Sequence, residues 1–178
     1  MVDTPFIIVI AGPNGVGKST FAKWYLEQHP SCVGIVDPDA IARELHIEDI
    51  GARNVAAGRI ALATIESYME QGLSFAIEST LSGKTLAAKL ADASLIGYRI
   101  VICLLQIPRL DISSQRVAKR VATGGHNIPY ADQQRRFERT YRNFHDHYTE
   151  VCHEWNIYDA QLDPPRIIAT GSGGFATR

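Results

Sequence analysis

The residues best suited to chemistry lie in one glycine-rich stretch that follows the apolar run 6–11. This stretch matches the pattern GxxxxGK[ST] in full. Its members are Gly12, Pro13, Asn14, Gly15, Val16, Gly17, Lys18, Ser19 and Thr20. Glycines let backbone N–H groups turn inward around phosphate oxygens, and the start of the following helix adds partial positive charge. Lys18 would reach the terminal phosphates and the Ser19 hydroxyl would join the Mg²⁺ shell. The motif therefore predicts binding of a nucleoside triphosphate, with ATP and Mg²⁺ as the expected cofactors.

Three classes of phosphate-loop protein compete for this motif: a transporter ATPase subunit, a GTP switch and a small-molecule kinase. A transporter subunit needs an LSGGQ-like signature, and the nearest approach, residues 81–84, lacks the second glycine and lies too close to the loop. A GTP switch needs an Asn/Thr-Lys-x-Asp motif that recognises the guanine base, and the sequence has none. The kinase interpretation remains.

A kinase needs a base for the acceptor hydroxyl, and two aspartates follow the second apolar run. Asp37 is well explained as a helix N-cap, with Pro38 at the first helical position. Asp39 would then lie in the first turn, where two interpretations stay open. It could be the general base, or it could complement the helix dipole and pair with Arg43 four residues on.

A third carboxylate, Glu78, ends the apolar run 73–77 and is followed by Ser79 and Thr80. An acidic residue in this place could hold Mg²⁺ or one of its waters. The alternative is a hydrogen-bonded carboxylate at a strand end, and the position favours function.

The segment 109–142 is the most basic part of the chain, with eight Lys and Arg residues against three Asp and Glu residues. Its cations are Arg109, Arg116, Lys119, Arg120, Arg135, Arg136, Arg139 and Arg142. Arg116 and Arg120 share one helical face, and the glycine-containing stretch 124–129 follows. A helix, a glycine hinge and a second Arg-bearing helix predict a lid that closes over phosphates. A solvated basic face would explain some of these arginines but not the hinge.

Strand and helix patterns alternate along the chain, which positions these residues at one edge of a sheet. Strands are expected at 6–11, 33–36, 73–77, 98–105 and 166–169, with a weaker candidate at 156–158. Helices are expected at 18–28, 38–46, 52–71, 84–95, 110–123 and 131–153. The pattern predicts a three-layer α/β sandwich of the P-loop type. Its mostly parallel sheet of five to six strands would carry helices on both faces and an Arg-rich helical lid. We expect one domain over residues 1–170 and a flexible tail over 171–178.

The balance of charged residues bears on which classes of partner the protein could bind. The chain has 178 residues, and its 18 Lys and Arg residues nearly balance 19 Asp and Glu residues, for a net charge of −1. We therefore expect neither nucleic acid nor an anionic membrane as partner. No run is long enough to span a bilayer. The three cysteines, Cys32, Cys103 and Cys152, form no CxxC pair, so a reducing cytoplasm is the expected location.

Taken together, these motifs resemble the zeta-toxin family of P-loop kinases in order and spacing. The matching pieces are the phosphate loop, residues 36–39, Gln71-Gly72, residues 77–80 and Gly97-Tyr98. Short bacterial members of the family also carry an Arg-rich helix, then Gly-Gly-His-x-Ile/Val-Pro, then Arg-Arg-Phe/Tyr. The corresponding residues here are Arg116–Arg120, Gly124–Pro129 and Arg135–Phe137.

The resemblance implies an ATP- and Mg²⁺-dependent kinase that acts on the hydroxyl of a small molecule, which in the toxins is a UDP-amino sugar. Asp39 matches the family's catalytic base, Lys18 and Ser19 match its phosphate and Mg²⁺ positions, and Glu78 and Thr80 match acceptor-side positions. A phosphate-stabilising arginine would be Arg116 or Arg120. An antitoxin-like protein partner is also implied.

The sequence departs from the toxin pattern in the lid. His126 stands where the toxins carry a second lid arginine, so Arg135 or Arg136 would have to supply that charge. The substrate-gripping Glu of the toxins has no counterpart, because Leu62 falls there. These departures leave the identity of the acceptor undetermined. They also leave open a nucleotide-binding regulatory or toxin–antitoxin module without efficient phosphoryl transfer.

Overall fold

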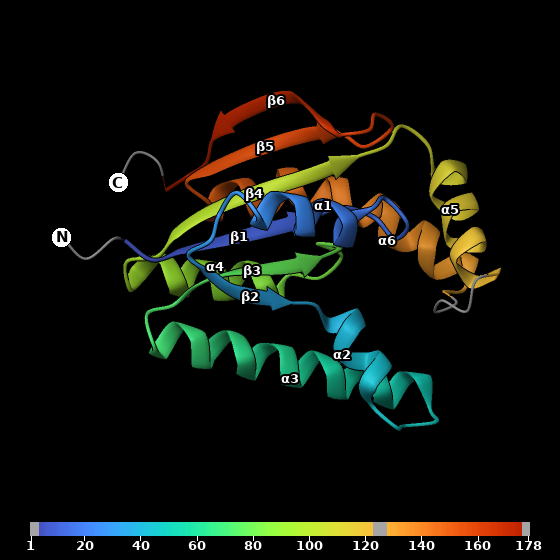
Figure 1. Ribbon diagram of the computed structural model, residues 1–178, viewed down its shortest axis with the longest axis horizontal. Helices are drawn as coiled ribbons and strands as arrows, with labels where there is room; N and C mark the ends of the chain where they lie inside the picture. Colours follow the sequence, from blue (N-terminus) through green and yellow to red (C-terminus); the bar gives the residue numbers. More distant parts are fainter. Residues whose placement is uncertain (1–3, 123–127, 176–178) are drawn as a thin grey trace.

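The strongest strand pattern in the sequence, β1, lies in the middle of a six-stranded sheet (Figure 1). The computed structural model describes residues 4–122 and 128–175. Its strands are β1 (Phe6–Ala11), β2 (Cys32–Val36), β3 (Ser74–Ser79), β4 (Arg99–Gln106), β5 (Glu154–Asp159) and β6 (Arg166–Ser172). They follow the order β2-β3-β1-β4-β5-β6. The strands β1 to β5 are parallel and β6 pairs antiparallel with β5. The carboxyl ends of β1 to β5 therefore share one edge of the sheet.

Helices alternate with these strands. They are α1 (Lys18–Leu26), α2 (Pro38–Glu44), α3 (Ile50–Glu70), α4 (Thr85–Leu95), α5 (Leu110–Ala122) and α6 (Tyr130–Asn143). Figure 1 shows α2 and α5 beyond the carboxyl ends of the strands, the edge at which open α/β sheets bind ligands.

The core divides into two clusters because alternate residues of the central strands face opposite sides of the sheet. Ile7 and Val9 of β1 belong to a cluster that includes residues of α3 and α4. Ile8 and Ile10 belong to a second cluster that includes Phe21 of α1. Helices thus cover both faces, and the predicted three-layer α/β sandwich with a mostly parallel sheet is confirmed.

The long helix expected at 131–153 is wrong in its second half. After α6 the chain forms a π-helical segment, η1 (Phe144–Tyr148), and a short 3₁₀ segment, η2 (Thr149–Val151). Phe144 and Tyr148 of the π-helical segment both lie in the core, where each is at most 1% exposed.

Residues 171–174 also differ from the flexible tail that was expected over 171–178. The strand β6 continues to Ser172, and the backbone N–H groups of Gly173 and Gly174 donate to the carbonyls of His153 and Thr149 at 3.1 and 2.9 Å. A Cβ atom at Gly171 would lie 2.2 Å from the Trp155 ring. The glycines of this segment are thus needed for close packing against the body of the protein.

Among the residues that are described, no helix is both long enough and apolar enough to cross a membrane.

Candidate active site

The phosphate loop connects β1 to α1 in a conformation that needs its glycines. Gly15 and Gly17 have φ angles of 75° and 105°, in the left-handed region that other residues rarely adopt. The Lys18 Nζ donates to the carbonyl oxygens of Gly12 and Pro13 at 3.0 and 3.1 Å, so the ammonium folds back over the loop. The backbone turn and the lysine together fit the phosphate chain of a nucleotide.

Two cavities meet at this edge of the sheet. The first, the loop cavity, has a volume of about 220 Å³. It is lined by Asn14, Gly15, Gly17, Lys18, Ser19, Thr20, Asp37, Asp39, Arg43, Glu78, Arg116 and Arg120. The second, the strand-end cavity, has a volume of about 210 Å³. It is lined by Lys18, Asp37, Pro38, Asp39, Asn54, Ala57, Glu78, Ser79, Thr80, Ser82 and Arg136. Lys18 and the three carboxylates belong to both cavities and so lie where the two meet.

The two aspartates at the start of α2 differ in their partners. The Asp37 carboxylate caps the helix by accepting from the Asp39 backbone N–H at 2.9 Å, and it lies 3.8 Å from an Arg43 Nη. Arg43 thus pairs with Asp37, and the pairing with Asp39 that the spacing allowed is wrong. The Asp39 carboxylate is exposed and accepts no hydrogen bond from the described residues. It is therefore the aspartate that is available to an acceptor hydroxyl.

Glu78 is buried, with 6% of its surface exposed, and its Oε2 accepts from the Ser19 hydroxyl at 3.0 Å. Burial, and then the nearby Asp37, raise the pKa of the Glu78 carboxyl. Burial lowers the pKa of the Lys18 ammonium, which Asp39 and Glu78 partly oppose. The pairing of a hydroxyl with a carboxylate offers the hard oxygen ligands that Mg²⁺ prefers. Ser19, with Glu78 beside it, therefore fits the metal position expected from the motif.

The raised pKa of Glu78 predicts a pH effect on stability. The folded protein binds this proton more tightly than the unfolded chain, so this group's contribution to stability falls as pH rises through the window above its ordinary value of 4.5. The substitution Glu78→Gln removes the ionisation. We expect a smaller loss of Tm with rising pH, and a Tm at or above wild type at pH 7 to 8.

Thermal unfolding followed by circular dichroism between pH 4 and 8 measures this effect. Glu70→Gln, at the exposed end of α3, is the matched control, and we expect it to follow the wild-type profile. Parallel profiles for Glu78→Gln and wild type would show that the buried carboxylate carries no such penalty.

The arginines expected in a lid lie at different sites in the structure. The Arg116 guanidinium donates to the carbonyl oxygens of Val16 and Ala160 at 3.2 and 3.1 Å. A Cβ atom at Gly15 would lie 2.7 Å from the Ser113 carbonyl oxygen of α5, so this helix packs directly on the phosphate loop. Arg116 and Arg120 both line the loop cavity.

The second arginine group splits between two faces of α6. Arg135 is exposed and pairs with Asp132 at 2.6 Å. Arg136 is half-buried and lines the strand-end cavity together with Thr80. His126 lies outside the described residues, and closure of the lid stays a prediction.

Several residues of the site, among them three polar ones, were not expected from the sequence. Asn54 of α3 and Ser82 line the strand-end cavity, and Arg43 lines the loop cavity. A polar residue on a long helix carries no motif of its own, so Asn54 gave no signal. Ser82 lies two residues after the predicted Thr80, and its side chain is within hydrogen-bond distance of it, with 2.9 Å between the hydroxyl oxygens.

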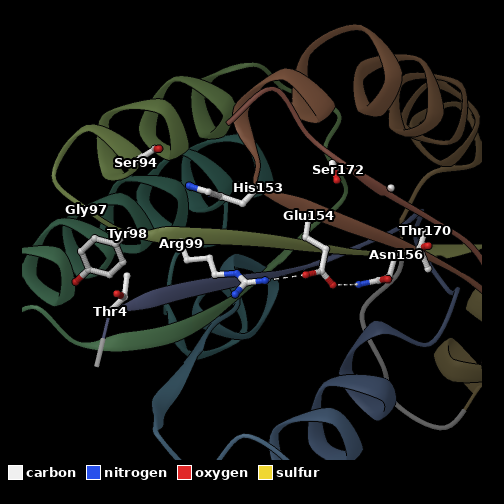
Figure 2. A pocket seen from close by; sticks show the side chains of 11 residues that line it. Thr4, Ser94, Gly97, Tyr98, Arg99, His153, Glu154, Asn156, Thr170 and Ser172 are labelled. Atoms are coloured by element: carbon white, nitrogen blue, oxygen red, sulfur yellow. Dashed lines mark hydrogen bonds and ion pairs between the residues drawn. The ribbon is translucent and has the colours of Figure 1, made fainter. Parts of the chain in front are cut away.

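A larger cavity of about 760 Å³ lies at the opposite edge of the sheet, by the amino ends of β4 and β5 (Figure 2). Several of its polar side chains are already engaged in hydrogen bonds. Glu154 accepts from Arg99 at 2.9 Å and from Asn156 at 3.0 Å, and the His153 Nδ1 accepts from the Ile100 backbone N–H at 3.0 Å. The convergence of loop, lysine and carboxylates at the carboxyl edge makes that edge the candidate active site.

Comparison with known proteins agrees with this architecture. The model of a family described as an AAA domain (AAA_33) matches residues 7–149. An uncharacterized protein of Haemophilus influenzae (strain Rd) is 30% identical over 121 residues, which is 68% of this chain and 84% of that protein.

Solved structures share the fold at much lower identity. A chain from the PezAT chromosomal toxin–antitoxin system of Streptococcus pneumoniae matches with a TM-score of 0.69 and 15% identity, covering 94% of this chain and 71% of that chain. A chain of the Pnkp1/Rnl/Hen1 RNA repair complex matches with a TM-score of 0.66 and 16% identity, covering 82% of this chain and 47% of that chain. These likenesses concern the fold alone.

Proposed function

Because the chain belongs to the AAA domain family, we propose that it is a P-loop kinase that transfers the γ-phosphoryl group of ATP to a hydroxyl of a small molecule. One observation carries this proposal. The cavity at the phosphate loop adjoins a second cavity, and Lys18, Asp39 and Glu78 line both. A hydrolase needs room only for water, whereas a kinase needs a separate acceptor site beside the γ-phosphate.

Each residue of the site has its own role in the proposed reaction. The loop backbone and Lys18 hold the phosphates, and Ser19 with Glu78 beside it would hold Mg²⁺. Mg²⁺, when bound, neutralises charge on the phosphate oxygens. Asp39 positions the acceptor hydroxyl in the strand-end cavity and accepts its proton. The hydroxyl oxygen bonds to the γ-phosphorus as the bond from that phosphorus to the β,γ-bridging oxygen breaks, and ADP leaves with the electron pair.

Arg116 and Arg120 line the loop cavity, where a guanidinium would stabilise charge on the transferring group. Arg116 is already held by two backbone carbonyls, so its position is fixed before a nucleotide binds. Fixed donors need no reorganisation during the reaction, so Arg116 is suited to this role.

The resemblance to zeta toxins favours UDP-amino sugars as the first acceptors to test, and the fold is shared with a chain of the PezAT toxin–antitoxin system. The resemblance also favours a search for an antitoxin-like partner. The test is incubation of the purified protein with [γ-³²P]ATP, Mg²⁺ and a panel of hydroxyl-bearing metabolites, including UDP-N-acetylglucosamine. Labelled product supports the kinase. Binding of ATP with no product from any acceptor would instead favour the regulatory module.

A further inference from the structure

The position of α6 over the strand-end cavity is fixed by hydrogen bonds to the loop that follows β3. The Thr140 hydroxyl donates to the Thr80 carbonyl oxygen at 2.6 Å, and the Asn143 amide donates to the Leu81 carbonyl oxygen at 2.7 Å. Thr140 and Asn143 are at most 5% exposed. These two bonds, three residues apart on one helical face, set the rotation of α6 about its own axis.

That rotation decides which arginine of the Arg135-Arg136 pair faces the cavity. Arg136 lies one helical turn before Thr140 and so lies on the same face of α6. It is half-buried and lines the strand-end cavity, whereas the loop cavity is lined by Arg43, Arg116 and Arg120. Arg136 is thus placed to meet an acceptor rather than the nucleotide phosphates.

The Arg136 guanidinium has no ion pair or hydrogen bond with any residue that the structure describes, whereas the other charges that line the cavity, apart from Asp39, are engaged. Asp37 pairs with Arg43 and accepts from a backbone N–H, and Glu78 accepts from the Ser19 hydroxyl. The Lys18 ammonium donates to carbonyl oxygens of the phosphate loop. A partly buried cation with no partner is costly. An anion on the bound acceptor would offset that cost, and a planar guanidinium matches the geometry of carboxylate and phosphate oxygens.

We propose that Arg136 binds an anionic group of the acceptor, so that the substrate is a hydroxyl-bearing metabolite that also carries a phosphate or a carboxylate. The inference rests on the proposed function for the meaning of the strand-end cavity as an acceptor site. The transferred phosphoryl group would then go to a hydroxyl held at Asp39 while the anion is held at Arg136.

Binding measurements test this without any turnover. The protein is saturated with the non-hydrolysable analogue AMP-PNP and Mg²⁺, so that the loop cavity is filled. Isothermal titration then compares three pairs of probes: glucuronate with glucose, N-acetylglucosamine 1-phosphate with N-acetylglucosamine, and UDP-N-acetylglucosamine with N-acetylglucosamine. We expect at least one anionic probe to bind more tightly than its neutral partner. The pairs separate carboxylate from phosphate recognition.

Substitution of the arginines assigns the effect to one residue. We expect Arg136→Gln to weaken binding of the preferred anionic probe by about 10- to 100-fold, with Arg136→Lys in between and AMP-PNP affinity unchanged. Arg135→Gln, one residue away but paired with Asp132 on the outer face, should leave the affinity as in wild type.

Equal affinity for charged and neutral probes, binding of neither, or an unchanged affinity in Arg136→Gln would overturn the inference. The two proposals fail in different ways. Arg136-dependent binding of an anionic probe without phosphorylation of any acceptor would sustain the inference and count against the kinase. Efficient phosphorylation of a neutral acceptor would support the kinase and count against the role of Arg136 in binding an anion.

Discussion

The substitution Asp39→Asn is expected to lower the rate of acceptor phosphorylation by about 10³-fold while the affinity for ATP stays nearly unchanged. The amide keeps the shape of the side chain but cannot accept the proton of the acceptor hydroxyl. Asp39 is the right residue to test because its carboxylate accepts no hydrogen bond from the described residues, whereas Asp37 is bonded to the backbone and lies against Arg43. The fold should not suffer, since the N-cap of α2 belongs to Asp37.

Single-turnover kinetics with saturating ATP measures the chemical step, and equilibrium titration with a fluorescent ATP analogue measures binding. The matched control is Asp92→Asn, an exposed carboxylate on α4 that lines neither cavity, and it should retain wild-type kinetics. Full activity of Asp39→Asn in the first assay would refute the assignment of the base. A parallel loss of ATP affinity would place the residue on the nucleotide instead.

How far the sequence predicts this site depends on how local each interaction is. The phosphate loop was predictable because its motif, its preceding strand and its following helix are contiguous in the chain. The meeting of Asp39 and Glu78 was predictable because the carboxyl ends of parallel strands share one edge of the sheet. The first inference uses only contiguous residues, and the second joins residues far apart in the sequence but needs only the alternation of strands and helices.

The distinction between Arg135 and Arg136 could not be predicted, because adjacent helical residues point about 100° apart and either could face the site. The choice is made by the bonds of Thr140 and Asn143 to the loop after β3, some 60 residues away in sequence. The break of the last helix has a similar cause. The π-helical segment buries Phe144 and Tyr148 in the core, and local propensity does not encode such tertiary packing.

The partner of Arg43 illustrates a third limit. Spacing of four residues allowed a pair with Asp39, yet the guanidinium lies near Asp37. Asp37 is in the extended conformation of an N-cap, with φ of −117°, so regular helical spacing does not apply to it.

The substitution Lys18→Ala is expected to reduce ATP affinity by at least about 100-fold and to abolish detectable phosphoryl transfer. Among the residues that the structure describes, the ammonium is the one cation that lines both cavities and bonds to the loop itself, and it has no substitute among the loop residues. The loop should nevertheless keep its shape. It is held by the Gly12 N–H donating to the Ser79 carbonyl oxygen at 3.2 Å, and its glycines supply the turn.

This expectation separates a binding defect from unfolding through the response of Tm to nucleotide. Ligand that binds only the folded state raises Tm, so wild type should be stabilised by ATP and Mg²⁺ and Lys18→Ala should not. Without nucleotide the variant should unfold at a similar temperature to wild type, because burial of the ammonium already lowers its pKa and makes its charge costly to keep. Lys23→Ala, an exposed lysine on the same helix, should keep the full nucleotide shift. A wild-type shift in Lys18→Ala would show that the loop binds phosphate through its backbone alone, and the role of the lysine would then be confined to the transfer step.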